Sequence, residues 1–359
     1  MTQCRIAMVL SGFPRRSETF AVNEIWALEQ RGVLAGIFAT KAGESVATHA
    51  ASKALAGRVH VLAEADIAHQ ADEVIKHLNG TAVSGVHGYF AHLPAELAER
   101  VAMRLGTRFG FSIHAKDARK VPREILSERA RKAACVVACN GDVADELRDS
   151  GAKVHLVPHG VDLDGFVPRP FPHVGPLQLL AVGRLVEKKG FHILIAAAAR
   201  LRRSFQLEII GEGPEETHLR KLIQKHGLES KVTLCGPKTH EDLPEAYKRA
   251  HVLIVPSIVD RSGDRDGLPN VVLEAMACGR PVIASDVAAI ANAVVDGETG
   301  LLTEPGNAES LAGAIDLLGE QYARLQQFGI KARERVQREY DLRTCTERFY
   351  DLLRNAYAC

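Results

Sequence analysis

The stretch DGLPNVVLEAMACGRPVIASD begins with Asp266 and places a second carboxylate, Glu274, eight positions later. Between them, Pro269 suits the first position of a helix, because its fixed φ matches a helix and its missing N–H would have no partner there. We expect the helix to run over residues 270–278 and to end at Gly279. Free amides and the positive end of the helix dipole would make a site for a phosphate, and the two acids could bind hydroxyl groups beside it.

Two basic residues, Arg184 and Lys189, lie five positions apart in GRLVEKKG, on a loop expected between a strand and a helix. A guanidinium and an ammonium there could clamp a diphosphate and offset its charge as a leaving group. Each feature also has a purely structural explanation. The basic loop could be a solvated surface, and the acids could be a dipole-favouring residue and a surface glutamate on an amphipathic helix.

In the first half of the chain, chemistry-bearing residues follow apolar runs that read as strands. Gly12 comes directly after the first run, where a small residue lets backbone amides approach a phosphate or a sugar, and Glu18 lies near the start of the next helix. VHGYF and FSIHAKD place His87, His114 and Asp117 at strand ends that we expect to face a ligand. A lone histidine at such a position is more often structural, but two on separate strand ends of one sheet favour a site.

The elements that would position these residues are short apolar runs alternating with amphipathic segments, the pattern of parallel sheets covered by helices. A proline-rich stretch, residues 166–176, interrupts the pattern as a linker would. The runs before it predict one doubly wound sheet and the runs after it a second, so we expect an α/β protein with a cleft between two sheets. The predicted strands are residues 5–10, 32–38, 58–62, 82–87, 109–114, 135–139 and 153–157, then 177–183, 206–211, 231–236, 251–257, 280–285 and 300–304.

The composition of the chain bears on whether it binds nucleic acid or a membrane, and on the cellular compartment. The 359 residues are 46% hydrophobic and 25% charged, with a net charge of +1, which favours two globular domains and argues against a nucleic-acid partner. No apolar run is long enough to span a bilayer, and the odd count of 7 cysteines favours free thiols in the cytoplasm. The basic stretch 119–132 could touch an anionic membrane surface peripherally, although a solvated helix face explains it as well.

The series GRLVEKKG, IIGEGP, DGLPNVVLEAMACGRPVIASD and DGETGLL, in that order, resembles the retaining GT-B glycosyltransferases of family 4, and FPRRSETFAVNEIWALEQRG resembles the exopolysaccharide and colanic-acid branch. The resemblance implies two Rossmann-like domains facing a cleft. We expect an acceptor-side domain over residues 1–168, a donor-binding domain over 169–343, and a C-terminal helix over 344–359 that packs back on the first domain.

The resemblance also implies roles for single residues. Asp266 matches the first acid of the donor-site signature, which is more usually Glu, and Glu274 matches the second, expected on the ribose hydroxyls of the nucleotide. His114 matches a histidine beside the donor sugar. The catalytic set is then His114, Arg184, Lys189 and Asp266. The donor-binding set is Gly12, Gly183, Arg184, Lys189, Gly211, Gly236, Asp266, Gly267, Leu268, Pro269, Asn270 and Glu274. The expected acceptor contacts are Glu18, His87, Tyr89 and Asp117.

By this resemblance the protein is a hexosyltransferase that moves a sugar, with retention, from a UDP- or GDP-sugar to a hydroxyl of a glycan, a lipid-linked glycan or a small molecule. No cofactor or metal is implied, because Arg184 and Lys189 can neutralise the diphosphate and no Asp-x-Asp motif is present. A second departure from the family pattern is His159, in place of a more usual asparagine, which we expect to affect only the hinge region. The alternatives are a non-catalytic nucleotide-sugar-binding subunit, or an epimerase or phosphorylase on the same fold. The donor base, the acceptor and the oligomeric state stay open.

Overall fold

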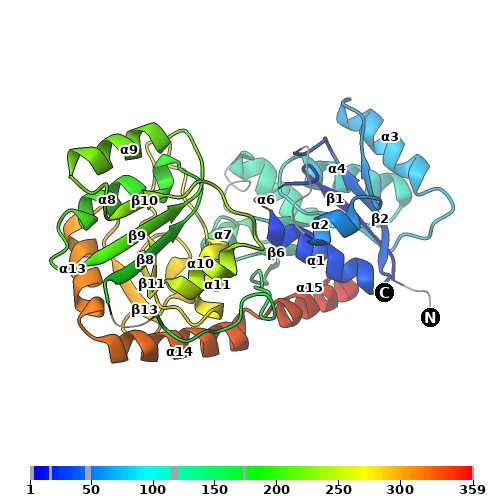
Figure 1. Ribbon diagram of the computed structural model, residues 1–359. Coiled ribbons are helices and arrows are strands. Elements are labelled where there is room, and N and C mark those ends of the chain that lie inside the picture. Colours follow the sequence, from blue (N-terminus) through cyan, green and yellow to red (C-terminus); the bar gives the residue numbers. More distant parts are fainter. Residues whose placement is uncertain (1–3, 16–17, 45–49, 115–119, 173–174, 358–359) are drawn as a thin grey trace. The chain divides into compact units, whose positions relative to one another are not determined.

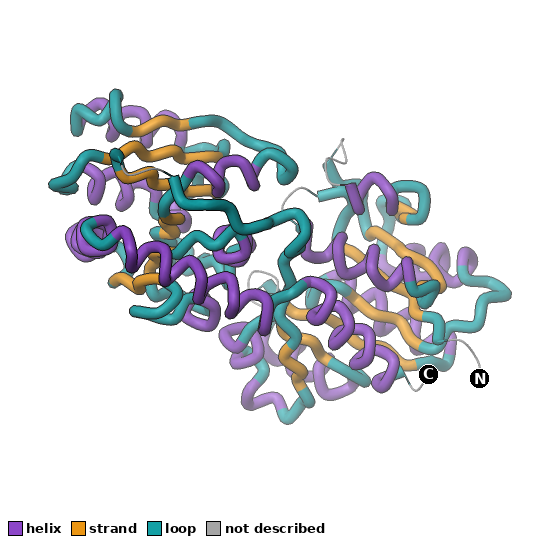
Figure 2. Tube along the Cα trace, turned by 60° about the horizontal axis from the view of Figure 1, so that its bottom comes forward, coloured by secondary structure: helices purple, strands orange, loops and turns teal. Residues whose placement is uncertain are grey.

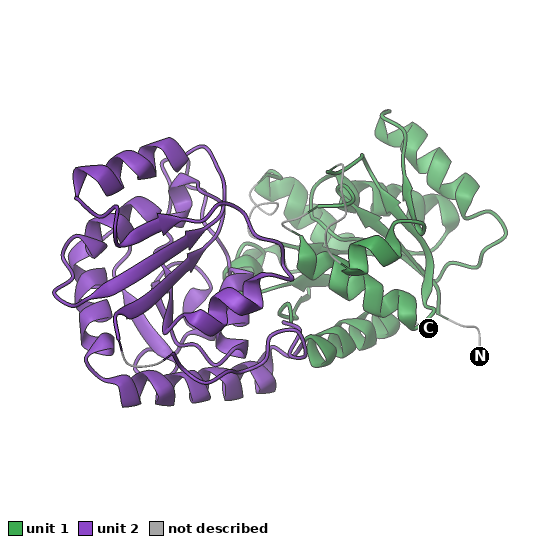
Figure 3. Ribbon diagram, in the orientation of Figure 1, with its two compact units in different colours: residues 1–160, 342–359 green, residues 161–341 purple. Residues whose placement is uncertain are grey.

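The computed structural model describes residues 4–15, 18–44, 50–114, 120–172 and 175–357. Its chain groups into two compact units (Figure 3): unit 1 is Met1–Gly160 with Leu342–Cys359, and unit 2 is Val161–Asp341. These bounds lie a few residues from the domain limits expected at 168 and 343. The reason is that the start of the proline-rich stretch packs in unit 2, where Phe166 is buried and Val161 N–H donates to the Tyr340 carbonyl over 2.9 Å.

Unit 1 is built on a seven-stranded parallel sheet with the order β3-β2-β1-β4-β5-β6-β7. Figure 1 labels β1, β2 and β6 of this sheet. The order reverses between β1 and β4, so this is where a doubly wound sheet opens at its carboxyl edge. The seven strands predicted in this half are confirmed. They are β1 (Ile6–Leu10), β2 (Leu34–Ala39), β3 (Val59–Val61), β4 (Gly85–Gly88), β5 (Arg108–Ile113), β6 (Val136–Ala138) and β7 (Val154–Leu156).

Helices follow the strands of unit 1, and a helix from the far end of the chain completes its core. This helix, α15, carries the buried side chains Phe349 and Leu353 and is followed by Tyr357, in the same hydrophobic cluster as β1. The Tyr357 ring fills the space above two strand glycines: a Cβ on Gly85 would lie 2.2 Å from it, and one on Gly110 would lie 2.8 Å from its hydroxyl. The helices are α1 (Thr19–Gln30), α2 (Ala50–Leu55), α3 (Ile67–His77), α4 (Leu93–Leu105), α6 (Arg123–Lys132), α7 (Gly141–Asp145), the short 3₁₀ helix η1 (Arg148–Ser150) and α15 (Leu342–Ala356).

Unit 2 holds a six-stranded parallel sheet with the order β10-β9-β8-β11-β12-β13, drawn with its covering helices in Figure 2. Here the order reverses between β8 and β11. The six strands predicted after the linker are confirmed as β8 (Leu177–Val182), β9 (Phe205–Ile210), β10 (Val232–Leu234), β11 (Val252–Val255), β12 (Val282–Ser285) and β13 (Gly300–Thr303). The fold is therefore α/β with two doubly wound sheets, as expected.

The helices of unit 2 cover both faces of its sheet, and a buried arginine ties the proline-rich stretch to them. The Arg280 guanidinium donates to the carbonyls of Arg169, Pro170, Tyr247 and Lys248, so residues 169 and 170 belong to this unit. The helices are η2 (Glu187–Lys189), α8 (Phe191–Ala198), α9 (Glu216–Lys225), α10 (Leu243–Arg249), α11 (Asn270–Ala277), α12 (Ile290–Ala293), α13 (Ala308–Gly319) and α14 (Tyr322–Glu339).

Two further properties bear on the expectations from sequence. Within the described residues, every helix is too short or too polar to span a bilayer. Cys135, Cys139, Cys235, Cys278 and Cys345 are free thiols, as expected, but Cys4 is disulfide-bonded, so the expectation fails there.

Candidate functional site

At the carboxyl edge of the unit 2 sheet, the loops after β8 and β11 bring the predicted cation and acid together. Lys189 Nζ lies 2.7 Å from Asp266 Oδ2, and the same oxygen accepts a hydrogen bond from Ser257 Oγ at 3.2 Å. The side chains of Lys189 and Asp266 are only 17% and 12% exposed. Burial alone would raise the pKa of Asp266, but the ammonium of Lys189, with that of Lys188, outweighs it and lowers the pKa. Asp266 is therefore a carboxylate held against a cation.

Lys188 is part of the same network, although sequence reasoning gave it no role. Its Nζ lies 3.4 Å from Asp266 Oδ1 and 3.2 Å from Asp264 Oδ2, and its carbonyl accepts from Ile258 N–H at 2.8 Å. Asp260 shapes the loop between these acids by accepting from the N–H of Asp264 at 3.0 Å. Two lysines and two carboxylates thus alternate at this strand edge. The signal for Lys188 was only its place beside Lys189.

Arg184, the other half of the predicted basic pair, is exposed, and among the described residues its side chain makes no ion pair that would occupy it. The preceding Gly183 packs on the lysine stem, since a Cβ there would lie 3.2 Å from Lys189 Cε. Gly211 is packed still more tightly, because its Cβ would lie 1.9 Å from the Gly183 carbonyl oxygen. Its N–H donates to the Gly236 carbonyl at 2.9 Å. The three predicted glycines, Gly183, Gly211 and Gly236, therefore lie next to one another where β8, β9 and β10 end.

The helix between the two acids starts at the predicted residue, but Pro269 takes a different position from the one expected. Helix α11 begins at Asn270, and Pro269 precedes it as the N-cap, with extended backbone (φ −66°, ψ 134°) and not as the first helical residue. Gly267 and Leu268 complete the approach, and all four residues are half-buried. The positive end of the α11 dipole lies at this turn, as required for an anion.

Glu274, on the second turn of α11, is 4% exposed. One of its oxygens accepts from the Tyr247 hydroxyl at 2.8 Å, and the other lies 3.5 Å from His240 Nε2. Burial raises the pKa of Tyr247 well above its usual value, and Glu274 raises it further, so the hydroxyl stays a donor. Burial would lower the pKa of His240, but the hydrogen bond to Glu274 raises it. Both partners come from the segment before β11, and nothing in the local sequence pointed to them.

In unit 1, the predicted His114 directly follows β5 and is 8% exposed. Its ring stacks on that of His159, with centroids 5.1 Å apart and planes 10° apart. His159 Nδ1 in turn lies 2.8 Å from Glu24 Oε1. The expectation that His159 affects only the hinge region is therefore wrong, because its ring packs on a predicted catalytic residue.

Two of the four expected acceptor residues, His87 and Tyr89, are each 0% exposed. His87 lies between Tyr357 Oη and Ser112 Oγ, each 2.9 Å from a ring nitrogen, and burial lowers its pKa to about 3. The Tyr89 hydroxyl donates to Glu24. The structure corrects both expectations, because these side chains belong to the core of unit 1 and present no atom to an acceptor.

The other predicted unit 1 residues lie at or near the strand edge. Glu18 pairs with Arg15 over 3.3 Å, and burial raises its pKa although Arg15 opposes the shift. Gly12 follows β1, with Lys41 as its neighbour: a Cβ there would lie 3.5 Å from the Lys41 carbonyl, an ordinary contact. Asp117 lies outside the described residues.

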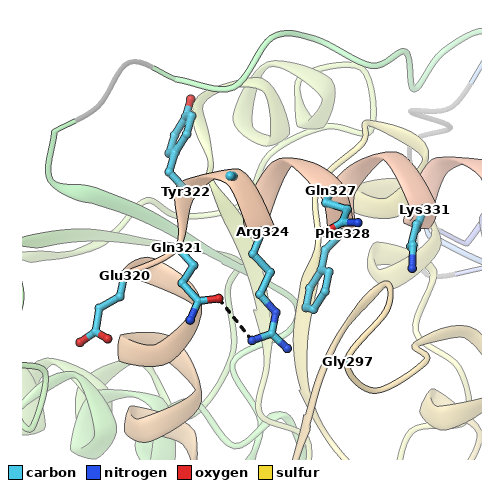
Figure 4. Close-up of a pocket in the computed structure, with 9 residues that line it drawn as sticks. Gly297, Glu320, Gln321, Tyr322, Arg324, Gln327, Phe328 and Lys331 are labelled. Carbon is cyan, nitrogen blue, oxygen red and sulfur yellow. Dashed lines mark hydrogen bonds between the residues drawn. The ribbon is translucent and has the colours of Figure 1, made fainter.

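A surface pocket of about 670 Å³ lies along the start of α14 (Figure 4). Its lining includes Arg324, which donates to Gln321, together with Phe328 and Lys331, and it includes none of the predicted site residues. Among the residues that the structure describes, no three His, Cys, Asp or Glu side chains gather as a metal site requires.

Comparison with known proteins gives the family. The model of the glycosyl transferases group 1 matches residues 168–335, and that of glycosyltransferase family 4 matches residues 17–164. A relative from Escherichia coli (strain K12), named colanic acid biosynthesis glycosyltransferase WcaL, is 27% identical over 404 residues, which cover 97% of this chain and 99% of its own.

Two solved structures share the fold over nearly the whole chain. Sucrose-phosphate synthase from Thermosynechococcus elongatus matches with a TM-score of 0.83 at 23% identity, covering 99% of each chain. HepE from Anabaena, solved in complex with UDP-glucose, matches with a TM-score of 0.81 at 17% identity, covering 98% of this chain and 99% of its own. With both family models matched and this fold in both units, the chain belongs to the family 4 glycosyltransferases of GT-B fold and is a transferase enzyme.

Proposed function

We propose that the protein transfers a sugar from a nucleoside-diphosphate sugar to a hydroxyl of a glycan, a lipid-linked glycan or a small-molecule acceptor, with retention at the anomeric carbon and without a metal ion. Unit 2 binds the donor and unit 1 the acceptor. The similarity to a relative named for colanic acid biosynthesis supports an acceptor that is an intermediate of an extracellular polysaccharide. Synthesis of such an intermediate would place the enzyme in the cytoplasm, at most peripherally on the membrane.

The observation that carries the proposal is the grouping of cations, a helix start and a buried acid at one sheet edge of unit 2. Arg184 is exposed, and Lys189 is held 2.7 Å from Asp266. A diphosphate at the α11 N-terminus would take Lys189 from that carboxylate, because two phosphate charges outcompete one. Asp266 would then accept hydrogen bonds from the hydroxyls of the donor sugar.

Glu274 fits the role of a ribose ligand. A carboxylate that is 4% exposed is costly to bury unless its oxygens have polar partners. Tyr247 donates a hydrogen bond to one oxygen of Glu274, and His240 lies beside the other. Each carboxylate oxygen has a second lone pair, which can accept from a ribose hydroxyl. That HepE was solved with UDP-glucose supports a UDP-sugar as the donor.

In this proposal the transfer reaction uses only the donor, the acceptor and side chains of the protein. The acceptor oxygen bonds to the anomeric carbon, the bond from that carbon to the diphosphate oxygen breaks, and the departing diphosphate receives the acceptor proton. Arg184 and Lys189 stabilise the charge that develops on the leaving group, which is the role a metal ion plays in other transferases. His114 acts from unit 1, beside the donor sugar.

A thermal-shift panel of UDP-, GDP- and dTDP-sugars, each with EDTA and with Mg²⁺, tests the donor assignment. A donor at 100 times its Kd stabilises the fold by about 2.7 kcal/mol, so one nucleotide should raise the melting temperature clearly and equally with EDTA. Arg220→Ala, which removes an exposed cation paired with Glu216 on α9, is a control variant and should leave the shift unchanged. No shift with any nucleotide sugar would refute donor binding, and a shift seen only with Mg²⁺ would refute metal independence. NMR of the first-formed product anomer tests retention.

A further inference from the structure

Three strand ends of unit 1 bring two histidines into a buried stack. His114 follows β5, His159 comes shortly after β7, and between them β6 is followed by Cys139. The two imidazoles lie 5.1 Å apart and nearly parallel, at 10°. The His159 side chain is 16% exposed. Stacked rings at this distance fix each other's planes, so whatever holds His159 also orients His114.

Glu24, on α1, holds His159. Its Oε1 lies 2.8 Å from His159 Nδ1, and its Oε2 accepts from the Tyr89 hydroxyl. The residue is 4% exposed, and a carboxylate so buried is tolerated only when it is paired and hydrogen-bonded. Helix α1 therefore places a buried carboxylate between His159, which comes after β7, and Tyr89, which follows β4.

Aromatic side chains close the remaining sides of the stack. Phe20, one turn before Glu24 on α1, lies 4.2 Å from the His159 ring and 5.3 Å from that of His114. Tyr89 stacks on His114 at 5.4 Å. Rotation of either imidazole would break several of these contacts, so the orientation of His114 is set by packing from α1, β4 and β7.

We propose that His159 and Glu24 are positioning residues, which through the stacked rings and the Glu24–His159 pair fix the plane and the electrostatic surroundings of the His114 imidazole during glycosyl transfer. The inference rests on the proposed function only in giving His114 a place beside the donor sugar. It gives a physical reason for histidine at position 159, where the resemblance to the family implied asparagine. Asparagine could hydrogen-bond to Glu24 but could supply neither an aromatic stacking face nor a cation.

The electrostatics of the cluster support this role. Burial alone would lower the pKa of His159, but the Glu24 carboxylate and Cys139 raise it to about 10, which favours the protonated ring at neutral pH. Burial lowers the pKa of His114 well below its usual value, and the charge on His159 lowers it further. Among the residues that the structure describes, the other titratable groups that act on the cluster include His87 on β4, His92 at the start of α4 and Glu18 before α1.

An uncharged His114 suits the chemistry. The transition state of glycosyl transfer gathers positive charge on the sugar ring, as in the oxocarbenium-like states of glycosidases. A cationic imidazole beside the sugar would oppose that charge, whereas a neutral one leaves a nitrogen lone pair to accept from a sugar hydroxyl. A positive charge on His159 therefore favours the neutral form of His114.

The test compares His159→Asn and Glu24→Gln with the wild-type protein. The first inserts the residue more usual in the family, and the second keeps the shape of the carboxylate without its charge, so both should fold. His69→Gln is the matched control, since His69 pairs with Asp66 at 2.9 Å in the same unit but is exposed. The readouts are the ¹⁵N chemical shifts of the histidine rings between pH 5 and 10, and the pH dependence of kcat/KM for the donor.

In the wild-type protein we expect a cationic ring at His159 and a neutral ring at His114 at pH 7. In both cluster variants the His114 ring should titrate at higher pH, and the acidic limb of kcat/KM should move with it. We expect kcat to fall about tenfold with donor affinity within twofold, because the ring is misplaced while the donor site is intact. A merely structural pair would leave the acidic limb where it is.

The inference is overturned if the wild-type His159 ring is neutral at pH 7, or if both variants keep the wild-type pH profile with kcat within twofold. These outcomes differ from failure of the proposed function. Loss of that proposal would appear as absence of donor binding in the wild-type protein, while the ring shifts of His114 and His159 would still report the state of the stacked pair.

Discussion

Replacing Lys189 with alanine should slow glycosyl transfer about 100-fold while unit 2 stays folded. The ammonium is the cation held closest to Asp266, at 2.7 Å, and its side chain is 17% exposed. Two unit charges about 4 Å apart in such a partly buried site interact by about 4 kcal/mol. A loss of about 2.7 kcal/mol, the part that water and Arg184 do not replace, corresponds to the 100-fold fall in kcat.

The fold should tolerate the change because the acid keeps other partners. Without Lys189, Asp266 still has Lys188 Nζ at 3.4 Å and Ser257 Oγ at 3.2 Å. The lost lysine stem leaves a gap beside Gly183, at the strand edge. Circular dichroism and thermal unfolding should therefore match the wild-type protein closely.

The assay is steady-state transfer or donor hydrolysis, with kcat and KM determined separately. Lys188→Ala is the matched control, because Lys188 Nζ lies 3.2 Å from Asp264 Oδ2 and 3.4 Å from Asp266 Oδ1, further from Asp266 than Lys189 Nζ. It should lower kcat by less than tenfold. A Lys189→Ala enzyme within threefold of wild-type kcat would remove Lys189 from the mechanism, and an equal loss in both variants would show that the network acts only by holding the loop.

Three further outcomes follow from the described contacts. Glu274→Ala should weaken donor binding by about 1–3 kcal/mol, as loss of hydrogen bonds to a charged group does, and unchanged affinity in isothermal titration would contradict its role. Burial lowers the pKa of His87 to about 3, so below about pH 6.5 the unfolded chain binds a proton that the native protein does not. The free energy of unfolding therefore decreases as the pH is lowered, by about 2 kcal/mol at pH 5. Urea unfolding of His87→Gln should show a smaller loss between pH 7 and pH 5 than the wild-type protein does. Gly211→Ala should destabilise unit 2 by about 1–3 kcal/mol, because its Cβ would lie 1.9 Å from the Gly183 carbonyl oxygen, whereas Gly313→Ala, in open space on α13, should stabilise the protein by up to about 1 kcal/mol in the same melting experiment.

The fold could be predicted because its strands are buried on both faces and therefore appear as short, continuous apolar runs. The same property limits what can be said of single strand residues. In a strand such as β4, where all four residues are buried, nothing in the sequence shows which face a side chain occupies. His87 was therefore expected at the ligand edge, and the structure places it in the core.

The site could be predicted where a residue's role follows from its chain neighbours and could not where it follows from packing. Asp266 and Glu274 flank a helix start that the sequence shows directly. Tyr247 reaches Glu274 from another helix, and Glu24 reaches His159 from 135 residues away, so these pairings exist only once the sheets have formed. The contacts of Lys188 could not be predicted for a different reason. The sequence does not show which way the side chains of two adjacent lysines point, and the structure shows that both reach Asp266.

The route of α15 constrains how the chain can be made. Tyr357 fills the space that Gly85 and Gly110 leave open in the sheet of unit 1, yet it is synthesised after the whole of unit 2. While the ribosome is still translating unit 2, the earlier sheet lacks the helix α15 that covers part of its apolar surface in the folded protein. The nascent protein must therefore keep an incomplete first domain from aggregating until α15 emerges, and unit 2, which is continuous in sequence, can close its own core before that.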